Sequence, residues 1–256
     1  MSVRVVRPGA FTTVQDLGRF GHRASGVPPA GAMDPRAARA ANRLVGNPED
    51  LAVLELTLSG PELVFARDSW IAITGASARG AFCLPAGEPL AVGRLSGGPR
   101  AWLAVDGGFD VPLVLGSRST SPRGGFGGFE GRALRAGDVL PLGRASRPPG
   151  SAPAFLLERP VTLRVLAGAQ APLFSDSART LFLESAWRVS PASDRCGLRL
   201  EGPALPSAAG GELLSEGVLP GAVQVPAGGS PILLGPDGPV TGGYPKIAQV
   251  IAVDVP

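Results

Sequence analysis

The chain has 256 residues, which predicts one or two domains and is long enough to bury a substantial core. Apolar residues make up 44% and charged residues 18% of it, which excludes an intrinsically disordered chain. The formal net charge is only +3, and Lys246 is the only lysine among 24 basic residues, so the composition gives no indication of a nucleic-acid partner.

Short runs rich in β-branched and aliphatic residues alternate with glycine and proline, which number 37 and 27. Strands and helices do not alternate regularly, so the pattern favours a mainly β protein built as a barrel or sandwich over an α/β protein. The strands predicted in this way are Glu62–Ala66, Trp70–Thr74, Ala101–Val105, Val161–Leu166, Ala222–Val225, Ile232–Leu234 and Val250–Val255.

One helix in the N-terminal half is predicted over Asp34–Gly46. Asp34 suits the N-cap position and Pro35 the first helical position, where its missing N–H is harmless. Gly46 suits the left-handed residue that ends many helices. A stripe of alanines ending at Leu44 predicts a thin face that packs closely on a sheet, and a second helix is predicted over Ser175–Phe182.

Residues 144–158 are rich in proline, serine and arginine and are predicted to be a linker. The linker divides the chain into an N-terminal half, residues 1–145, and a C-terminal half, residues 155–256. Weak similarities between motifs of the two halves favour an origin by duplication.

The cellular location follows from features that the sequence lacks. The first residues have no apolar signal-peptide core, and no apolar run approaches the length of a membrane span. Cys83 and Cys196 are far apart, which fits a reducing compartment, and His22 has no partner at zinc-ligand spacing. We therefore expect a cytoplasmic protein with no membrane association and no metal.

Several common catalytic motifs are excluded. The only lysine, Lys246, follows a proline, so there is no Walker A loop. The run Gly125–Glu130 resembles a dinucleotide fingerprint, but its last position is glutamate and no strand precedes it. No nucleophile elbow accompanies the single histidine, and no lysine stands in a biotin-carrier context.

Two polar clusters lie near the N-terminus. The first, Thr12–Arg19, places Gln15, Asp16 and Arg19 around a glycine, and it suits either a binding site or a buried turn with Asp16 and Arg19 paired. The second, Gly26–Asp34, is interpreted as the lead-in to the helix.

A third cluster surrounds Arg118. Ser117 and Ser119 flank it, and hydroxyls around a guanidinium suit a carboxylate or phosphate, although a polar loop would have the same composition. The glycine-rich segment Arg123–Gly128 that follows is expected to be a mobile flap.

Two more clusters lie in the C-terminal half. Asp194 and Arg195 suit either a site or a β-turn in which Asp194 bonds its own backbone. Gln224 and the only tyrosine, Tyr244, form the last cluster, in which the tyrosine either covers a planar ligand or fills the core.

With these clusters in view, the chain resembles the KipA/PxpC family, also called the allophanate hydrolase subunit 2 or biotin-dependent carboxyltransferase family. The resemblance covers most of the chain in family order and is carried by RPGAFTTVQDLGRFGHRASGVPPAGAMD, AANRLVGN, LELTLSGPEL, LAVDGGFDVPLVLGSRST, SDRCGLRLEGPAL, SEGVLPGAVQVP and TGGYPKIAQVIAVD. Any one of these motifs alone is weak, and the set is highly specific.

The resemblance implies a mainly β fold of two cyclophilin-like β-barrel domains with a short helix in the N-terminal half. It implies the C component of an ATP-dependent 5-oxoprolinase, which hydrolyses 5-oxo-L-proline to L-glutamate together with subunits A and B. Two other roles stay open within the family. One is the carboxyltransferase component of a biotin-dependent urea carboxylase or allophanate pathway, and the other is a KipA-like regulatory binder without catalysis. A homo-oligomer also stays open.

For a small cyclic amide bearing a carboxylate, the clusters suggest a division of roles. The candidate catalytic residues are Asp16, Arg118 and Asp194. The candidate substrate-binding residues are Gln15, Arg19, Ser117, Ser119, Arg195, Gln224 and Tyr244. ATP is expected as a cofactor of the complex, biotin only in the carboxyltransferase alternative, and no metal in either.

The chain departs from the family pattern in two places. The stretch between Leu90 and Arg100 is expected to lack a strand and turn, and the segment that closes the second barrel in other members does not follow Pro256. We expect a partner or a second copy to cover the strand edge left open.

Overall fold

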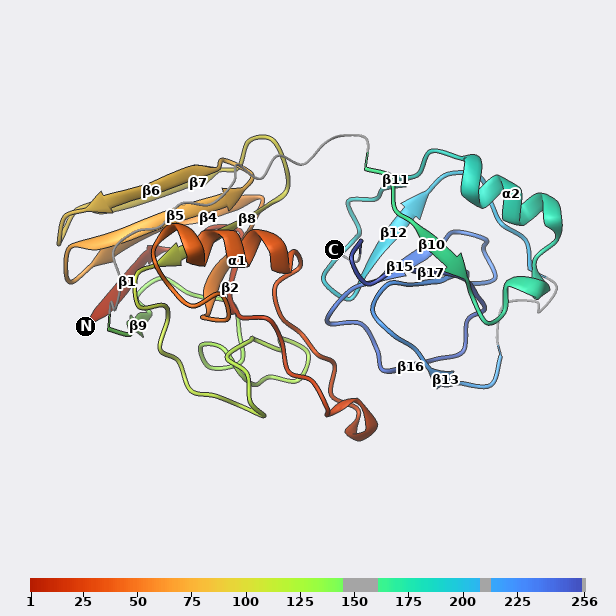
Figure 1. The fold of residues 1–256 in the computed structure, drawn as a ribbon, viewed down its shortest axis with the longest axis horizontal. Coiled ribbons are helices and arrows are strands. Elements are labelled where there is room, and N and C mark those ends of the chain that lie inside the picture. The colour runs from red at the N-terminus through yellow and green to blue at the C-terminus, as the bar shows by residue number, and fades with distance from the viewer. Residues whose placement is uncertain (145–160, 208–212, 255–256) are drawn as a thin grey trace. The chain divides into compact units, whose positions relative to one another are not determined.

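The computed structural model describes residues 1–144, 161–207 and 213–254. Its contacts separate the chain into two compact units, Met1–Phe20 with Ala30–Arg159, and Gly21–Pro29 with Pro160–Pro256. Figure 1 shows both units as mainly β, with one α-helix in each. The predicted linker, residues 144–158, lies outside the described residues except for Arg144.

The first unit is built on a nine-stranded sheet of antiparallel pairs in the order β6-β5-β8-β3-β4-β1-β9, with β2 paired to β3 and β7 to β4. The strands predicted at 62–66, 70–74 and 101–105 are confirmed as parts of β4, β5 and β8. The full set is β1 (Ser2–Arg7), β2 (Phe11–Gln15), β3 (Val53–Thr57), β4 (Ser59–Phe65), β5 (Ser69–Gly75), β6 (Arg79–Leu84), β7 (Pro89–Arg94), β8 (Arg100–Val105) and β9 (Val139–Pro141).

The mainly β prediction is confirmed. Within the described ranges, however, the strand pairings give open sheets and no closed barrel. β2 and β7 branch from strands that already have two neighbours, so the first sheet divides rather than closes. Alternate residues such as Val3, Val5, Leu63 and Phe65 point to one face and are fully buried in its core.

The predicted N-terminal-half helix is confirmed as α1 (Pro35–Leu44). The Asp34 carboxylate accepts from the amides of Arg36 (2.9 Å) and Ala37 (3.1 Å), and Gly46 has a φ of 75° beyond the helix end. The alanine face packs on β5 and β8, where Thr74 Oγ1 donates to the Ala37 carbonyl at 2.8 Å. This packing brings the loop that precedes α1 onto the sheet.

The second unit contains a six-stranded sheet in the order β10-β17-β14-β15-β12-β11 and a separate pair, β13-β16. Its core includes Phe174, Leu205, Val225 and Ile247. The strands are β10 (Val165–Ala167), β11 (Arg188–Val189), β12 (Gly197–Glu201), β13 (Glu216–Gly217), β14 (Ala222–Gln224), β15 (Ile232–Leu234), β16 (Thr241–Gly242) and β17 (Lys246–Val250). The helical elements are η1 (Arg23–Ser25), η2 (Ala171–Leu173) and α2 (Asp176–Glu184), and α2 confirms the predicted second helix with Ser175 as its N-cap.

Two strand predictions in this unit are wrong in their bounds. The strand predicted at 161–166 begins only at Val165, and the one predicted at 250–255 ends at Val250, with residues 252–254 in a turn. The cause is a side-chain clamp, because the Asp254 carboxylate accepts from Arg164 N (2.9 Å), Nε (2.9 Å) and Nη2 (2.7 Å). These contacts replace the regular ladder where the two segments meet.

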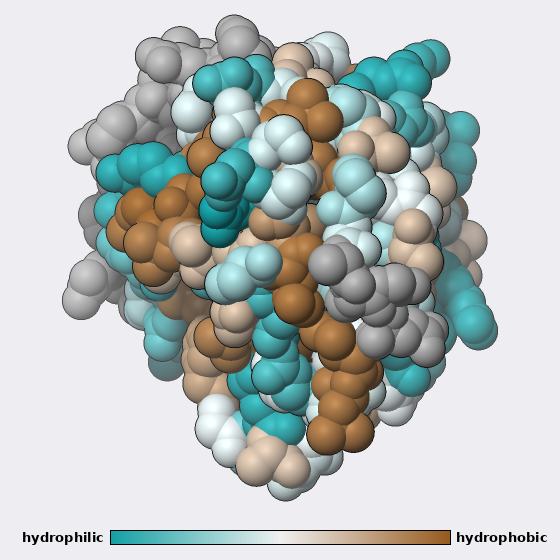
Figure 2. All heavy atoms as spheres, turned by 90° about the vertical axis from the view of Figure 1, so that its right-hand side faces the viewer, coloured by the Kyte–Doolittle hydropathy of each residue, from teal (hydrophilic) through white to brown (hydrophobic). Residues whose placement is uncertain are grey.

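Large apolar side chains are exposed on the second unit. They include Leu183 on α2, at 65% exposed, and Leu214, at 93%. Figure 2 shows apolar groups between polar ones on this side of the molecule. Exposed apolar side chains that stand singly are normal on protein surfaces and do not by themselves indicate an interface.

Arg132 and Asp138 form a clamp beside β9 that predicts how stability depends on pH. Arg132 Nη1 and Nη2 donate to Asp138 at 2.8 and 3.0 Å. The Arg132 hydrogen bonds lower the pKa of Asp138, and the Arg135 amide lowers it further. Because the folded-state pKa is depressed, the stabilisation is complete above the unfolded-state pKa of about 3.9 and is lost as the pH falls through the folded-state value.

We therefore expect Asp138→Asn to flatten the dependence of unfolding free energy on pH below about pH 4, measured by urea denaturation at a series of pH values. The exposed Asp50 provides the control, since Asp50→Asn should leave the wild-type slope intact. A wild-type slope in Asp138→Asn would contradict the expectation.

Candidate functional site

Asp16 is the centre of a buried polar cluster in the first unit. It follows β2 and is 9% exposed. Its Oδ1 accepts from Ser117 Oγ at 2.6 Å, Ser119 Oγ at 2.5 Å and the Gly18 amide at 2.8 Å. Its Oδ2 accepts from the Arg118 amide at 2.5 Å. The carboxylate thus joins the turn after β2 to a segment about one hundred residues later in the chain.

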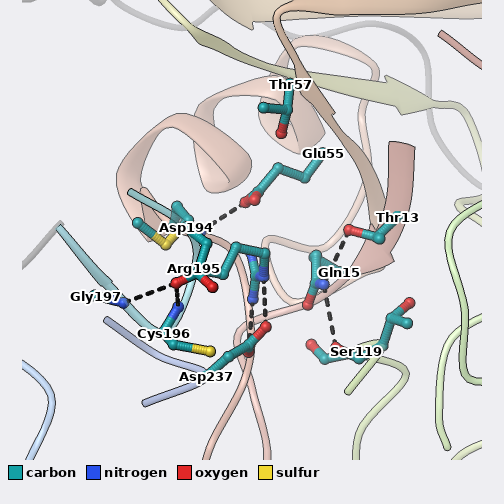
Figure 3. Close-up of polar contacts among 12 residues, drawn as sticks. Thr13, Gln15, Glu55, Thr57, Ser119, Asp194, Arg195, Cys196, Gly197 and Asp237 are labelled. Atoms are coloured by element: carbon teal, nitrogen blue, oxygen red, sulfur yellow. Dashed lines mark hydrogen bonds and ion pairs between the residues drawn. The ribbon is translucent and has the colours of Figure 1, made fainter. Parts of the chain in front are cut away.

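Gln15 lies beside this cluster and is fully buried. Its Nε2 donates to Thr13 Oγ1 at 3.1 Å, as Figure 3 shows, and to the Thr120 carbonyl at 3.3 Å. Its Oε1 accepts no hydrogen bond from any residue in the described ranges. Buried acceptors without a partner are uncommon, so Gln15 retains the capacity to accept one hydrogen bond from a ligand or a water molecule.

Arg118 directs its guanidinium away from the neighbouring serines. Nε donates to the Val111 carbonyl and Nη2 to Asp110 Oδ1, each at 2.9 Å, while Ser117 and Ser119 bond to Asp16. The hydroxyls and the guanidinium therefore do not face one another as the sequence pattern suggested. A role of Arg118 in holding an anion stays a prediction.

Arg19 is 1% exposed. Its Nε donates to the Val114 carbonyl at 3.4 Å, its Nη2 donates to the Ser119 carbonyl, and its Cζ lies 4.9 Å from the centre of the Phe126 ring. The arginine of the first cluster thus lies among residues of the third cluster and of the glycine-rich segment.

The glycine-rich segment, residues 123–128, is held by backbone hydrogen bonds. Ser121 N donates to the Phe126 carbonyl and Gly125 N to the Ser121 carbonyl, each at 2.9 Å. Together with the residues that follow it, this segment lines a cavity of about 440 Å³. The segment forms a hydrogen-bonded turn, and its role as a mobile flap stays a prediction.

In the second unit, Arg195 and Asp237 form a buried bidentate ion pair, with Nε to Oδ2 at 2.7 Å and Nη2 to Oδ1 at 3.0 Å (Figure 3). Their side chains are only 5% and 6% exposed. Asp194, by contrast, is exposed, and its Oδ1 accepts from the amides of Cys196 (2.8 Å) and Gly197 (3.2 Å). Asp194 thus bonds the backbone of its own turn, as in the β-turn interpretation of the sequence.

Gln224 and Tyr244 complete the predicted set. Gln224 is 3% exposed, and its Nε2 donates to no residue in the part of the chain that the structure describes. A Cβ at Gly242 would lie 2.5 Å from this nitrogen, so a larger residue there would displace the amide from its present position. Tyr244 is 37% exposed and therefore does not fill the core.

Lys246 is a candidate site residue that the sequence patterns did not indicate. Its Nζ pairs with Glu216, and this hydrogen bond lowers the pKa of Glu216. Gln170 Nε2 also donates to Glu216, at 2.6 Å, and Gln170 Oε1 accepts from the Lys246 amide. Lys246 lies opposite Gln224 in the β14–β17 register. The only feature of the sequence that could have drawn attention to Lys246 is that the chain has no other lysine.

Glu55 is a second such residue, which lies on β3 and is 1% exposed. Its carboxylate accepts from the Met33 amide at 2.7 Å, Trp102 Nε1 at 3.0 Å and Arg100 Nη1 at 3.1 Å. These contacts fix the loop before α1 to the sheet. A single glutamate within a strand gives no sequence signal for this burial.

The predicted site residues thus fall into two groups. The first unit holds Gln15, Asp16, Arg19, Ser117, Arg118 and Ser119, and the second holds Asp194, Arg195, Gln224 and Tyr244. The described residues contain no group of three or more histidine, cysteine, aspartate and glutamate side chains placed to hold a metal ion. They also contain no helix long and apolar enough to span a membrane.

Comparisons with known proteins match this geometry to one family. Residues 25–256 match the family model described as "Carboxyltransferase domain, subdomain A and B". The C component of the Escherichia coli K12 5-oxoprolinase is 42% identical, over 99% of this chain and 86% of its own length. The Haemophilus influenzae protein of the same name is 38% identical, over 95% of this chain and 82% of its own.

A solved structure extends the match to the fold. The crystal structure of the Kluyveromyces lactis urea carboxylase matches 99% of this chain with a TM-score of 0.91 and 34% identity. The match covers 26% of that much longer protein. The motifs, the mainly β fold and these relatives agree, and the chain belongs to the carboxyltransferase-domain family, which is the KipA/PxpC family that its motifs resemble.

Proposed function

We propose that this chain is the C component of an ATP-dependent 5-oxoprolinase, which hydrolyses 5-oxo-L-proline to L-glutamate together with subunits A and B. The observation that carries the proposal is the 42% identity to the C component of the Escherichia coli 5-oxoprolinase over nearly the whole of this chain. The reaction adds water across a cyclic amide, so the chain would act as part of a hydrolase complex.

The proposal assigns ATP to the complex. A five-membered lactam is a poor electrophile, and activation of its carbonyl oxygen by phosphorylation would explain the requirement for ATP. Within the described ranges, the only lysine is held by Glu216 and Gln170 and stands in no phosphate-binding loop. No step involving ATP is therefore assigned to this chain.

The geometry supports binding and positioning roles for the polar residues of the first unit. The Asp16 carboxylate already accepts four hydrogen bonds, which makes it a positioning residue for the Ser117–Ser119 segment. Gln15 Oε1, buried and able to accept one more hydrogen bond, suits the N–H of a cyclic amide. In the second unit, Gln224 Nε2 is also buried and able to donate one more hydrogen bond.

Two relatives named as a subunit of 5-oxoprolinase, from Escherichia coli and Haemophilus influenzae, support association with other chains. Subunits A and B are the partners in this proposal, and a second copy of this chain is the alternative occupant.

The test is 5-oxo-L-proline-dependent formation of glutamate and ADP by this chain mixed with subunits A and B, with each component omitted in turn. Glutamate formed only in the complete mixture supports the proposal. If the three chains co-elute on a sizing column and no glutamate forms, or if glutamate forms without this chain, the proposal fails.

The match to urea carboxylase favours a second candidate, carboxyl transfer from a biotin carried on another protein. Transfer of labelled carboxylate from carboxybiotin to urea, dependent on this chain, would support it. Biotin is required only in this alternative, so avidin would block the transfer and leave 5-oxoprolinase activity unchanged.

A further inference from the structure

The cavity beside the glycine-rich segment has the features of a ligand site. It measures about 440 Å³ and is lined by Pro112, Val114 and the continuous run Gly125–Gly131. Two of the lining side chains, Phe126 and Phe129, are aromatic, and most of the rest of the run is glycine. A space of this size exceeds what one water molecule or one inorganic oxyanion fills.

Backbone amides of the lining segment have no acceptor. Gly127 and Gly128 are buried, with φ angles of 72° and 54°, and no residue within the described ranges accepts a hydrogen bond from their N–H groups. The amides of the half-buried Phe129 and the exposed Glu130 also have no acceptor among the described residues. Buried N–H groups without a partner are rare, and successive amides in turn conformations form concave anion-binding sites.

The shape of this segment depends on glycine. A Cβ at Gly127 would collide with the Ser119 carbonyl, and a Cβ at Gly128 would collide with Thr120 Oγ1. The backbone of Gly127 and Gly128 therefore lies directly against Ser119, a member of the Asp16 cluster, and Thr120.

A buried positive charge lies next to the cavity. Arg19 donates to the Val114 carbonyl and lies over the Phe126 ring. Its Nη2 would lie 2.7 Å from a Cβ if residue 127 had one, so the guanidinium is close to the Gly127 backbone. Two lining residues, Val114 and Phe126, thus contact the guanidinium of Arg19, which is 1% exposed. Because this guanidinium is itself buried, water screens its charge less than that of a surface arginine, and the charge favours an anion bound beside it.

One acidic group also lines the cavity. The Glu130 side chain is 65% exposed and pairs with Arg132 Nη2 at 2.6 Å. Arg132 in turn lies 5.4 Å from the centre of the Phe129 ring. The acidic group is thus partly neutralised, and both aromatic walls of the cavity have an arginine against them.

We propose that this cavity binds a small organic carboxylate, with the carboxylate on the amides of residues 127–130 and its planar or apolar body against Phe126 and Phe129. The amides and Arg19 select the negative charge, and the aromatic walls select an organic body over a bare oxyanion. The proposal goes beyond the proposed function, because this site lies within the first unit and requires no partner subunit.

Two matched pairs of probes test the proposal on the full chain by isothermal titration calorimetry. One pair is 5-oxo-L-proline and 2-pyrrolidinone, and the other is benzoate and benzamide. In each pair only the first compound carries a negative charge. We expect at least one carboxylate to bind about tenfold or more tightly than its neutral counterpart, as for loss of one charge-assisted contact. Inorganic phosphate should bind more weakly than that carboxylate.

Two variants locate the binding. Glu130→Gln removes the negative charge on the cavity and should tighten carboxylate binding about twofold to fivefold at low salt. The exposed Glu88 gives the matched control, because Glu88→Gln should change nothing. Phe126→Leu keeps an apolar wall, removes the ring and should weaken binding about fivefold or more.

Other outcomes overturn the proposal. Binding of neither carboxylate, equal binding of charged and neutral probes, or binding of phosphate as tight as that of the carboxylates would each do so. Binding that both variants leave unchanged would place the ligand elsewhere. Failure of 5-oxo-L-proline turnover in the complex would not overturn the proposal, since benzoate binding is independent of the reaction.

Discussion

Replacement of Asp237 by alanine will lower the free energy of unfolding of the second unit by about 3–5 kcal/mol. Asp237 supplies both acceptors of the bidentate contact with Arg195, and the two side chains are 6% and 5% exposed. The variant removes two charge-assisted hydrogen bonds from a buried guanidinium at once, each worth about 1.5–3 kcal/mol. The effect should therefore far exceed that of losing a surface contact.

The measurement is native-state hydrogen exchange of peptides from β14 and β17, which reports the second unit separately from the first. Asp176 gives a matched control, since its carboxylate pairs with Arg179 while 92% exposed. Asp176→Ala should cost less than about 1 kcal/mol. Similar effects of the two alanine substitutions would show that the buried pair contributes no more than a surface pair.

Elements with local signals could be predicted from the sequence. Helix α1 has its N-cap, first-turn proline and terminal glycine within one segment, and its prediction at Asp34–Gly46 is confirmed almost to the residue. Strand β15 is likewise predicted at Ile232–Leu234, from an aliphatic run between glycines and prolines. In both cases the determining interactions lie within the element or beside it.

Elements determined by distant partners could not be predicted. Strand β1 contains two arginines among its valines and becomes a strand because β4 and β9 pair with it. The end of β17 depends on Arg164 and Asp254, which are 90 residues apart. Such strands form through packing on their neighbours rather than through intrinsic propensity.

The candidate site shows the same division. The sequence marked Asp16 and the Ser117–Ser119 segment as separate clusters, but only the fold shows that the carboxylate bonds both serines. The guanidinium of Arg118 was expected to face those serines. In the structure, its backbone amide joins the cluster while its side chain bonds Asp110, a distinction that residue types alone do not carry.

Replacement of Asp16 by alanine will destabilise the first unit by about 3–5 kcal/mol, because four hydrogen-bond donors, two of them buried and two partly buried, lose their acceptor together. Asp16→Asn should cost about half as much. Its oxygen can keep the partners of Oδ1, whereas its NH₂ would face the Arg118 amide, donor against donor. Asp110→Asn is the control, since that carboxylate is 58% exposed and should matter by less than about 1 kcal/mol.

A double-mutant cycle separates the serines from the backbone amides in this cluster. Ser119→Ala removes one hydroxyl donor and also the acceptor of the Asp16 amide. With exchange of first-unit peptides as the readout, we expect Asp16→Ala and Ser119→Ala together to cost at least about 1 kcal/mol less than the sum of the single changes. A coupling near zero would mean that the other three donors hold the carboxylate without Ser119. That serine would then be free to serve a ligand, and the case for Asp16 as its positioning residue would fall.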